Sequence, residues 1–129
     1  MDNLTIYCNA HYFKSSHRAY GGYIMQYNDH FKTYVEINIA IEADLICLEL
    51  LWQSVSLLKK SCDIRIVSRF PINTPELKSG KGSKLWEFLN DLRVENGHKY
   101  TFDSQYYKSD IQYLEALEAA IVEKHDEEI

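Results

Sequence analysis

The chain has 129 residues, of which 46% are hydrophobic and 26% are charged, which is ordinary for a globular domain and excludes collagen-like and disordered proteins. No apolar run approaches the roughly 18 residues of a membrane-spanning helix, and the first residues lack a secretory signal pattern, so we expect a soluble, cytoplasmic protein with no membrane partner. The formal net charge of −5 argues against a strong, sequence-independent nucleic-acid binder.

The first third of the chain is predicted to form three strands. Residues 4–9, 19–27 and 31–39 are rich in apolar, aromatic and β-branched side chains that alternate with polar ones. The polar residues 28–30 leave room only for a tight turn between the second and third strands. The sequence therefore predicts an antiparallel hairpin at this point.

The hydrophobic period then changes to that of a helix. Residues 42–60 place Leu45, Leu48 and Trp52 on one stripe, with two lysines in the last turn. Residues 62–68 read as a buried strand, and Thr74 followed by Pro75 predicts the N-cap and first position of a short helix. A helix over 83–96, a strand over 98–102 and a helix over 109–124 complete the chain.

Three strands followed by a helix, a strand, two helices, a strand and a helix predict an α/β fold. The sheet is expected to be mixed, with five strands and with helices on its faces. The last two strands must then join it through right-handed crossovers. We expect residues 1–125 to form one domain and residues 126–129 to form an acidic C-terminal tail.

The cysteine content favours buried thiols over disulfides. The three cysteines, Cys8, Cys47 and Cys62, are an odd number in a chain without a secretory signal. Cys8 and His11 have a spacing that could form half of a zinc site, but no second close pair completes it.

The order of elements and several short segments resemble the ribonuclease H family. Residues 6–10 are similar to its first strand, the Gly21-Gly22 pair to the start of its second strand, and residues 42–48 to the start of its central helix. Residues 64–70 lie where its fourth strand ends. The resemblance implies a ribonuclease H-like fold and, in the family, phosphodiester hydrolysis by two divalent cations held by carboxylates.

The chain departs from the family at the positions of these carboxylates. The resemblance places Asn9 and Arg69 at two of the aspartates and Asp44 at the central-helix glutamate. The last carboxylate corresponds to Glu115 or to Asp110, and the apolar register of the helix favours Glu115. An amide and a guanidinium cannot hold two divalent cations. We therefore expect a degenerate centre without metal or other cofactor, in which Arg69 pairs with Asp44.

The link between the second and third helices is short where many family members insert a basic segment that grips a hybrid duplex. It carries a small basic group: Lys78, Lys81 and Lys84. These lysines are candidates for contact with nucleic acid, and a solvated turn is the alternative interpretation.

Tyrosines are abundant, and seven of them are candidates for partly exposed positions at an interface: Tyr12, Tyr20, Tyr23, Tyr27, Tyr34, Tyr106 and Tyr107. The sequence favours a non-enzymatic interaction module, with a protein partner or self-association through an edge strand ahead of nucleic acid. The alternative is a divergent ribonuclease H that cleaves RNA in RNA/DNA hybrids, with Asp44 and Glu115 binding Mg²⁺ or Mn²⁺. A different α/β enzyme would need a catalytic signature, and the sequence has no evident one.

Overall fold

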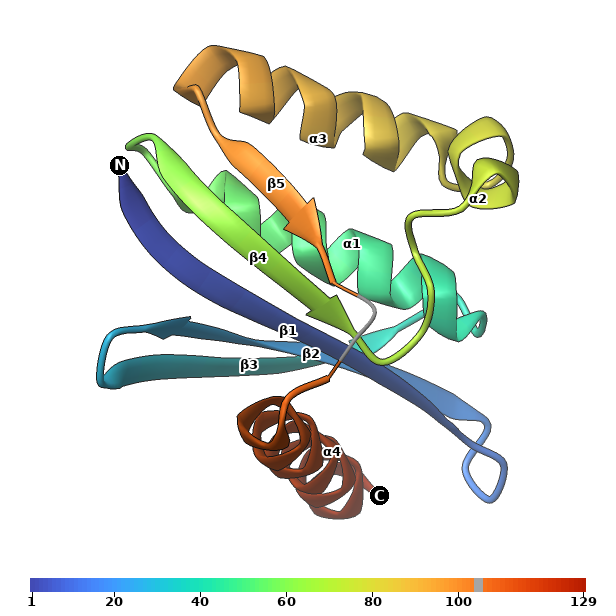
Figure 1. Ribbon diagram of the computed structural model, residues 1–129. Coiled ribbons are helices and arrows are strands. Elements are labelled where there is room, and N and C mark those ends of the chain that lie inside the picture. Colours follow the sequence, from blue (N-terminus) through green and yellow to red (C-terminus); the bar gives the residue numbers. More distant parts are fainter. Residues whose placement is uncertain (104–105) are drawn as a thin grey trace.

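The computed structural model describes residues 1–103 and 106–129. In this part of the chain the strands are β1 (Asp2–Phe13), β2 (Arg18–Tyr27), β3 (His30–Asn38), β4 (Cys62–Ser68) and β5 (Lys99–Phe102). The helices are α1 (Ala43–Ser56), α2 (Pro75–Ser79), α3 (Ser83–Asn96) and α4 (Lys108–Glu128). The order of elements is the predicted one (Figure 1).

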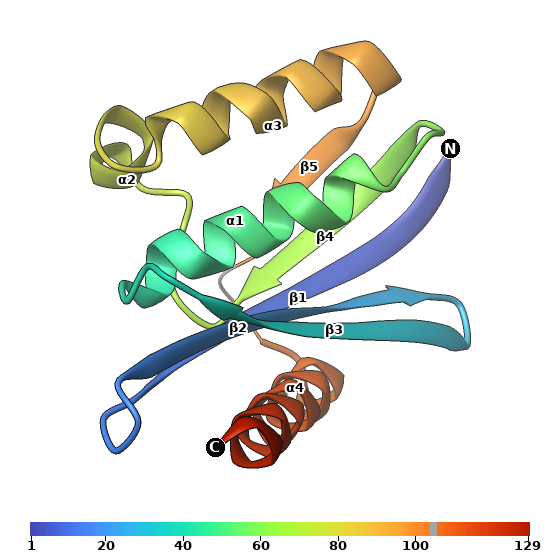
Figure 2. The ribbon, with the colours of Figure 1, turned by 180° about the vertical axis from the view of Figure 1, so that it is seen from behind.

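The strands form one mixed sheet in the order β3-β2-β1-β4-β5. β1, β2 and β3 form an antiparallel meander, and β4 and β5 extend the sheet parallel to β1. α1 packs on β1 and β2 from one face, with α3 against α1, whereas α4 covers β1, β2 and β3 from the other face (Figures 1 and 2). This arrangement confirms the predicted five-stranded mixed sheet flanked by helices.

Two cores lie on the two faces of the sheet because successive strand residues point to opposite sides. The larger core joins the sheet to α1 and α3 and contains all three cysteines, which are buried and free, as predicted. The smaller core joins the sheet to α4 through Tyr7, Ile24 and Leu117. Tyr20 and Tyr23 belong to these cores and are nearly inaccessible, so the prediction that they are partly exposed is wrong.

Several element ends differ from the predicted ones. α1 ends at Ser56, four residues early, because the next two backbone N–H groups bond in tighter turns to Ser54 and Val55. β1 extends to Phe13 because the pairing with β2 continues to Arg18. α4 continues through residues 126–128, which the sequence assigns to a tail. Its C-terminal end is held by Arg18, whose Nη1 donates to the Glu128 carbonyl at 2.9 Å.

Two local signals give the structure that they predict. The Thr74 hydroxyl accepts a hydrogen bond from the Leu77 N–H at 3.2 Å, so Thr74 caps α2. Gly97 has a left-handed conformation with φ 68° and ends α3. No helix in residues 1–103 and 106–129 is long and apolar enough to cross a membrane.

Candidate functional site

The candidate site lies where β1 and the end of β4 run side by side. The Arg69 N–H, just beyond β4, donates to the Cys8 carbonyl at 2.9 Å. This bond continues the parallel pairing of the two strands and places Arg69 next to Asn9. On the other side of β1, Asn9 pairs with Gly22 of β2. Parallel strand pairing therefore brings together two of the positions that the sequence singles out.

Asn9 is buried, and both polar atoms of its side chain are hydrogen-bonded. Its Oδ1 accepts from the Ala10 N–H at 2.8 Å, and its Nδ2 donates to Oε2 of Glu118 on α4 at 2.8 Å. The other oxygen of Glu118, Oε1, lies 2.8 Å from Nδ1 of His11. We call these three side chains, Asn9, His11 and Glu118, the β1–α4 clamp. An amide can donate to this carboxylate, whereas a second carboxylate at the Asn9 position would repel it.

A cavity of about 570 Å³ opens beside the clamp. Asn9, Arg69 and Glu115 all line it, so the structure brings together three of the four predicted site positions. Arg69 and Glu115 are exposed there and, within the described residues, neither side chain makes a hydrogen bond or an ion pair. The carboxylate that α4 directs to Asn9 is that of Glu118, three residues after the predicted Glu115.

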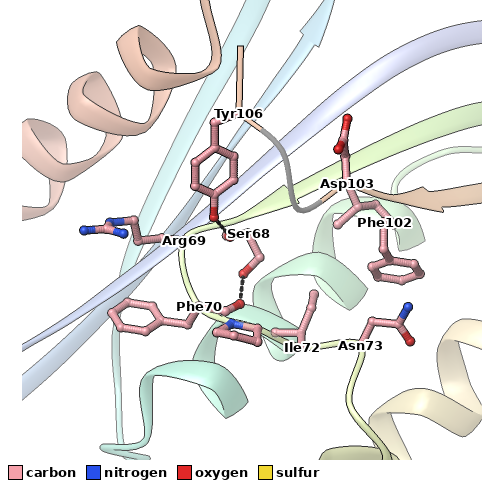
Figure 3. A pocket seen from close by; sticks show the side chains of 10 residues that line it. Ser68, Arg69, Phe70, Ile72, Asn73, Phe102, Asp103 and Tyr106 are labelled. Carbon is pink, nitrogen blue, oxygen red and sulfur yellow. Dashed lines mark hydrogen bonds between the residues drawn. The ribbon is translucent and has the colours of Figure 1, made fainter. Parts of the chain in front are cut away.

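A second cavity, of about 440 Å³, lies on the other side of Arg69, at the carboxyl ends of β4 and β5 (Figure 3). Its walls are aromatic and mostly uncharged, with Phe70, Phe102 and Tyr106 around the end of β4. The Tyr106 hydroxyl donates to the Ser68 carbonyl at 2.7 Å, which holds this ring over the strand end. Ligands of open α/β sheets bind outside the carboxyl ends of parallel strands, which is where both cavities lie.

Asp44 does not join the other predicted residues. It lies in the first turn of α1, where its Oδ1 accepts from the Leu45 N–H at 2.8 Å, and it lines neither cavity. Within the described residues Arg69 forms no ion pair, so the expected pairing of Arg69 with Asp44 is wrong. The first turn of a helix favours a carboxylate electrostatically, which accounts for Asp44 without a ligand.

Asp110, the other candidate for the last carboxylate, is held in a buried ion pair. Its two oxygens accept from Nη1 and Nη2 of Arg65 at 2.8 and 2.7 Å, and the Tyr7 hydroxyl donates to it at 2.8 Å. The hydrogen bonds from Arg65 lower the pKa of Asp110 from 3.8 to about 2. Burial and the nearby carboxylate raise the pKa of Tyr7. This group connects β1, β4 and α4, and sequence reasoning missed it although an arginine inside a buried strand signals an acidic partner.

The resemblance to the ribonuclease H family implies a pair of divalent cations, but Asn9 and Arg69 supply no anionic oxygen to hold them. The amide of Asn9 is committed to the clamp, and the guanidinium of Arg69 supplies a positive charge beside it. Within residues 1–103 and 106–129, no three His, Cys, Asp or Glu side chains lie close enough together to hold a metal ion. The arrangement can instead offer a permanent cation and aromatic walls to a ligand.

The three lysines predicted to contact nucleic acid each have a partner within the protein. The contacts are Lys81 Nζ to Glu42 Oε1 at 2.6 Å, Lys84 Nζ to Glu87 Oε2 at 3.7 Å, and Lys78 Nζ at 4.7 Å from the centre of the Trp86 ring. The two acidic partners offset the positive charge of this surface.

One similar solved structure is that of the foamy viral protease-reverse transcriptase in complex with dsDNA. The superposition has a TM-score of 0.60 and 8% sequence identity, and it covers 88% of this chain and 89% of that chain. No family model and no curated protein sequence matches the chain. At this identity the likeness concerns the fold alone, and it supports the ribonuclease H-like fold that the order of elements predicts.

Proposed function

We propose that this ribonuclease H-like domain is catalytically degenerate and acts as an interaction module, with a protein partner favoured over nucleic acid. The observation that carries the proposal is the β1–α4 clamp beside Arg69. Two-metal catalysis needs anionic oxygens that bridge both cations and support the attacking and leaving oxygens. Asn9 offers no anionic oxygen, and its amide is already hydrogen-bonded to Glu118 at 2.8 Å.

Arg69 strengthens this argument because its charge cannot be removed at physiological pH. A guanidinium that lines the same cavity as Asn9 and Glu115 repels a divalent cation there. It also attracts the anionic groups that cations would otherwise attract, such as carboxylates of a partner protein. The proposed role of Arg69 is therefore recognition of a partner.

The choice of a protein partner rests on charge and on exposed apolar surface. The formal net charge is −5, and Lys81 and Lys84 are paired with acidic side chains. Large apolar side chains are exposed along β3, including Phe31 and Ile37. Nucleic acid remains the second class of partner, because the similar foamy viral structure is a complex with dsDNA.

The test of this function is a cleavage assay with an RNA/DNA hybrid in Mg²⁺ and in Mn²⁺. We expect the wild-type protein to leave the hybrid intact, at a level equal to a protein-free control. The alternative, a divergent ribonuclease H that uses Asp44 and Glu115, predicts cleavage that Asp44→Ala and Glu115→Ala abolish. The variant Glu87→Ala, whose carboxylate is exposed on α3, is the matched control for the removal of an acidic side chain. Cleavage that is lost in the first two variants and kept in the third would overturn the proposal.

A further inference from the structure

β3 is the outermost strand of the meander. It pairs with β2 on one side, and no other strand of the described chain lies on its outer side (Figures 1 and 2). All nine residues, from His30 to Asn38, take part in the pairing with β2, so the pairing of the strand is not interrupted by a bulge. A long edge strand with unpaired N–H and C=O groups is a ready template for another strand.

β3 exposes three large hydrophobic side chains. Phe31 is 63% exposed, Ile37 is 51% exposed and Tyr34 is 38% exposed. Phe31 and Val35 lie on the α4 side of the sheet, where Phe31 contacts the Tyr113 ring and Val35 packs on the smaller core. Because side chains alternate, Ile37 lies on the same side. Two apolar groups near opposite ends of one strand face thus remain open to solvent.

The side chains of β3 match those of a second β3 that runs antiparallel to it. Tyr34 is the central residue of the strand, so the antiparallel register that uses its whole length places Tyr34 opposite Tyr34 of a second copy. That register pairs Phe31 with Ile37 on the α4 side and Lys32 with Glu36 on the α1 side. Directly opposite residues in an antiparallel pair lie close together on one face, and both pairs are of kinds that stabilise a sheet.

Neither charge of the Lys32–Glu36 pair is neutralised by an ion pair within one copy of the described chain. Lys32 forms no ion pair within the described residues. Glu36 accepts from the Tyr34 hydroxyl at 2.8 Å and from Gln53 Nε2 at 2.7 Å, both neutral donors, so its charge is not offset. A twofold axis through the central tyrosines would form the Lys32–Glu36 pair twice.

The helices leave room for this pairing. α4 contacts β1 most, β2 less and β3 least, so its axis lies over β1 and β2 rather than over β3. The β2 strands of two copies joined through β3 are three strand spacings apart, about 14 Å. Packed helices need an axis separation of about 8 to 10 Å. Two copies can therefore form one continuous sheet without overlap of their α4 helices.

We propose that β3 is a self-association surface and that its occupant is β3 of a second copy, antiparallel and centred on Tyr34. The inference deepens the proposed function, since it names the partner of the interaction module, but it does not depend on the state of the nuclease centre. Its product is a twofold-symmetric dimer with a ten-stranded sheet.

The test is sedimentation velocity of the full chain over a range of concentrations. It compares the wild type with variants that reverse the charge of Lys32 or of Glu36. Lys32→Glu places two glutamates opposite each other twice, and Glu36→Lys does the same with two lysines. Each variant alone is expected to weaken dimerisation by about tenfold. A mixture of the two variants is expected to restore it, because every facing pair in the mixed dimer has opposite charges.

Lys99→Glu, on the opposite edge strand β5, is the matched control and should dimerise like the wild type. Circular dichroism of each variant checks that the fold is kept, and recovery in the mixture excludes misfolding as the cause of the loss. A wild-type protein that stays monomeric at all concentrations would overturn the inference and would assign Lys32 to protecting the edge. Dimers that both reversals leave intact would also overturn it. Neither result bears on the hybrid-cleavage assay, so the two proposals fail separately.

Discussion

Asn9 differs from an aspartate by one side-chain atom, a nitrogen in place of an oxygen. This difference changes the chemistry of the site without a change of the backbone. It occupies a buried position on β1 and donates to Glu118, so α4 is attached to the sheet by an amide–carboxylate hydrogen bond. In a carboxylate centre the same two positions would repel each other unless cations lay between them. The clamp therefore gives the protein, without metal, the cohesion that cations give to an acidic centre.

The change Asn9→Asp tests this account at the scale of one residue. At pH 7 we expect it to lower the free energy of unfolding by about 2 kcal/mol, because a donor is lost and two carboxylates face each other. The repulsion raises the pKa of one carboxyl in the folded state above its unfolded value, so the folded state takes up an extra proton as the pH falls. The difference in unfolding free energy between the wild type and Asn9→Asp should accordingly be smaller at pH 4 than at pH 7, as measured by urea unfolding.

The double variant Asn9→Asp/Glu118→Gln is the control for this prediction. It exchanges the amide and the carboxylate, so it restores a donor and an acceptor and should recover most of the stability at pH 7. A loss in Asn9→Asp that is the same at pH 7 and pH 4 would show that like-charge repulsion is not its cause.

At the scale of elements, the attachment of α4 depends on a second polar link at its N-terminal end. Arg65 of β4 binds Asp110 through both oxygens, and it also lies 2.9 Å from an oxygen of Asp103. The Asp110 side chain is only 1% exposed. Removing one partner of such a buried pair is costly because the other charge is left without compensation.

Arg65→Met should therefore lower the free energy of unfolding by about 3 kcal/mol at pH 7. In the wild type the pKa of Asp110 is lowered to about 2, so its contribution is complete above the unfolded value of 3.8 and is lost as the pH falls towards 2. The difference in unfolding free energy between the wild type and Arg65→Met should be smaller at pH 3 than at pH 7 in chemical unfolding.

The control is Arg69→Met, which removes an exposed, unpaired guanidinium and should change stability by less than about 0.5 kcal/mol. If the wild type and Arg65→Met differed in unfolding free energy by the same amount at pH 7 and pH 3, the ion pair between Arg65 and Asp110 would not be the cause of the loss.

The order and type of the elements could be predicted from sequence because local signals specify them. Alternation defines the strands, Thr74 and Pro75 start α2, and Gly97 ends α3. Tyr20 and Tyr23 were misplaced because tyrosine is amphipathic, and only the coverage of both sheet faces decides that these rings are buried. The extent of α4 was underestimated because it depends on a contact with Arg18, far away in the sequence.

The site was harder to predict because it depends on how α4 lies across β1. Glu115 and Glu118 are three residues apart and share one side of the helix, so periodicity cannot choose between them. The tertiary contact with Asn9 and His11 selects Glu118. The same holds for Arg65 and Asp110, whose pairing joins two elements that are distant in the chain. Asn9 and Arg69, which the resemblance to the ribonuclease H family singled out, lie side by side because β1 and β4 pair in parallel.

At the scale of the whole molecule, the chain keeps a ribonuclease H-like fold while its central side chains have a different charge pattern. The sheet order, the two helical layers and the site at the strand ends follow from backbone pairing and apolar packing, none of which needs carboxylates. Function is set by the few side chains that project from this frame. In our account those side chains favour a partner over a pair of cations.

The measurement that tests this claim most directly is calorimetric titration of Mn²⁺ into the wild-type protein and into the double variant Asn9→Asp/Arg69→Asp. We predict no binding to the wild type up to millimolar Mn²⁺ and no change in its melting temperature. The double variant, with two carboxylates introduced beside Glu118, should bind the ion and gain thermal stability from it. Micromolar binding of Mn²⁺ by the wild type, with a rise in its melting temperature, would contradict the account.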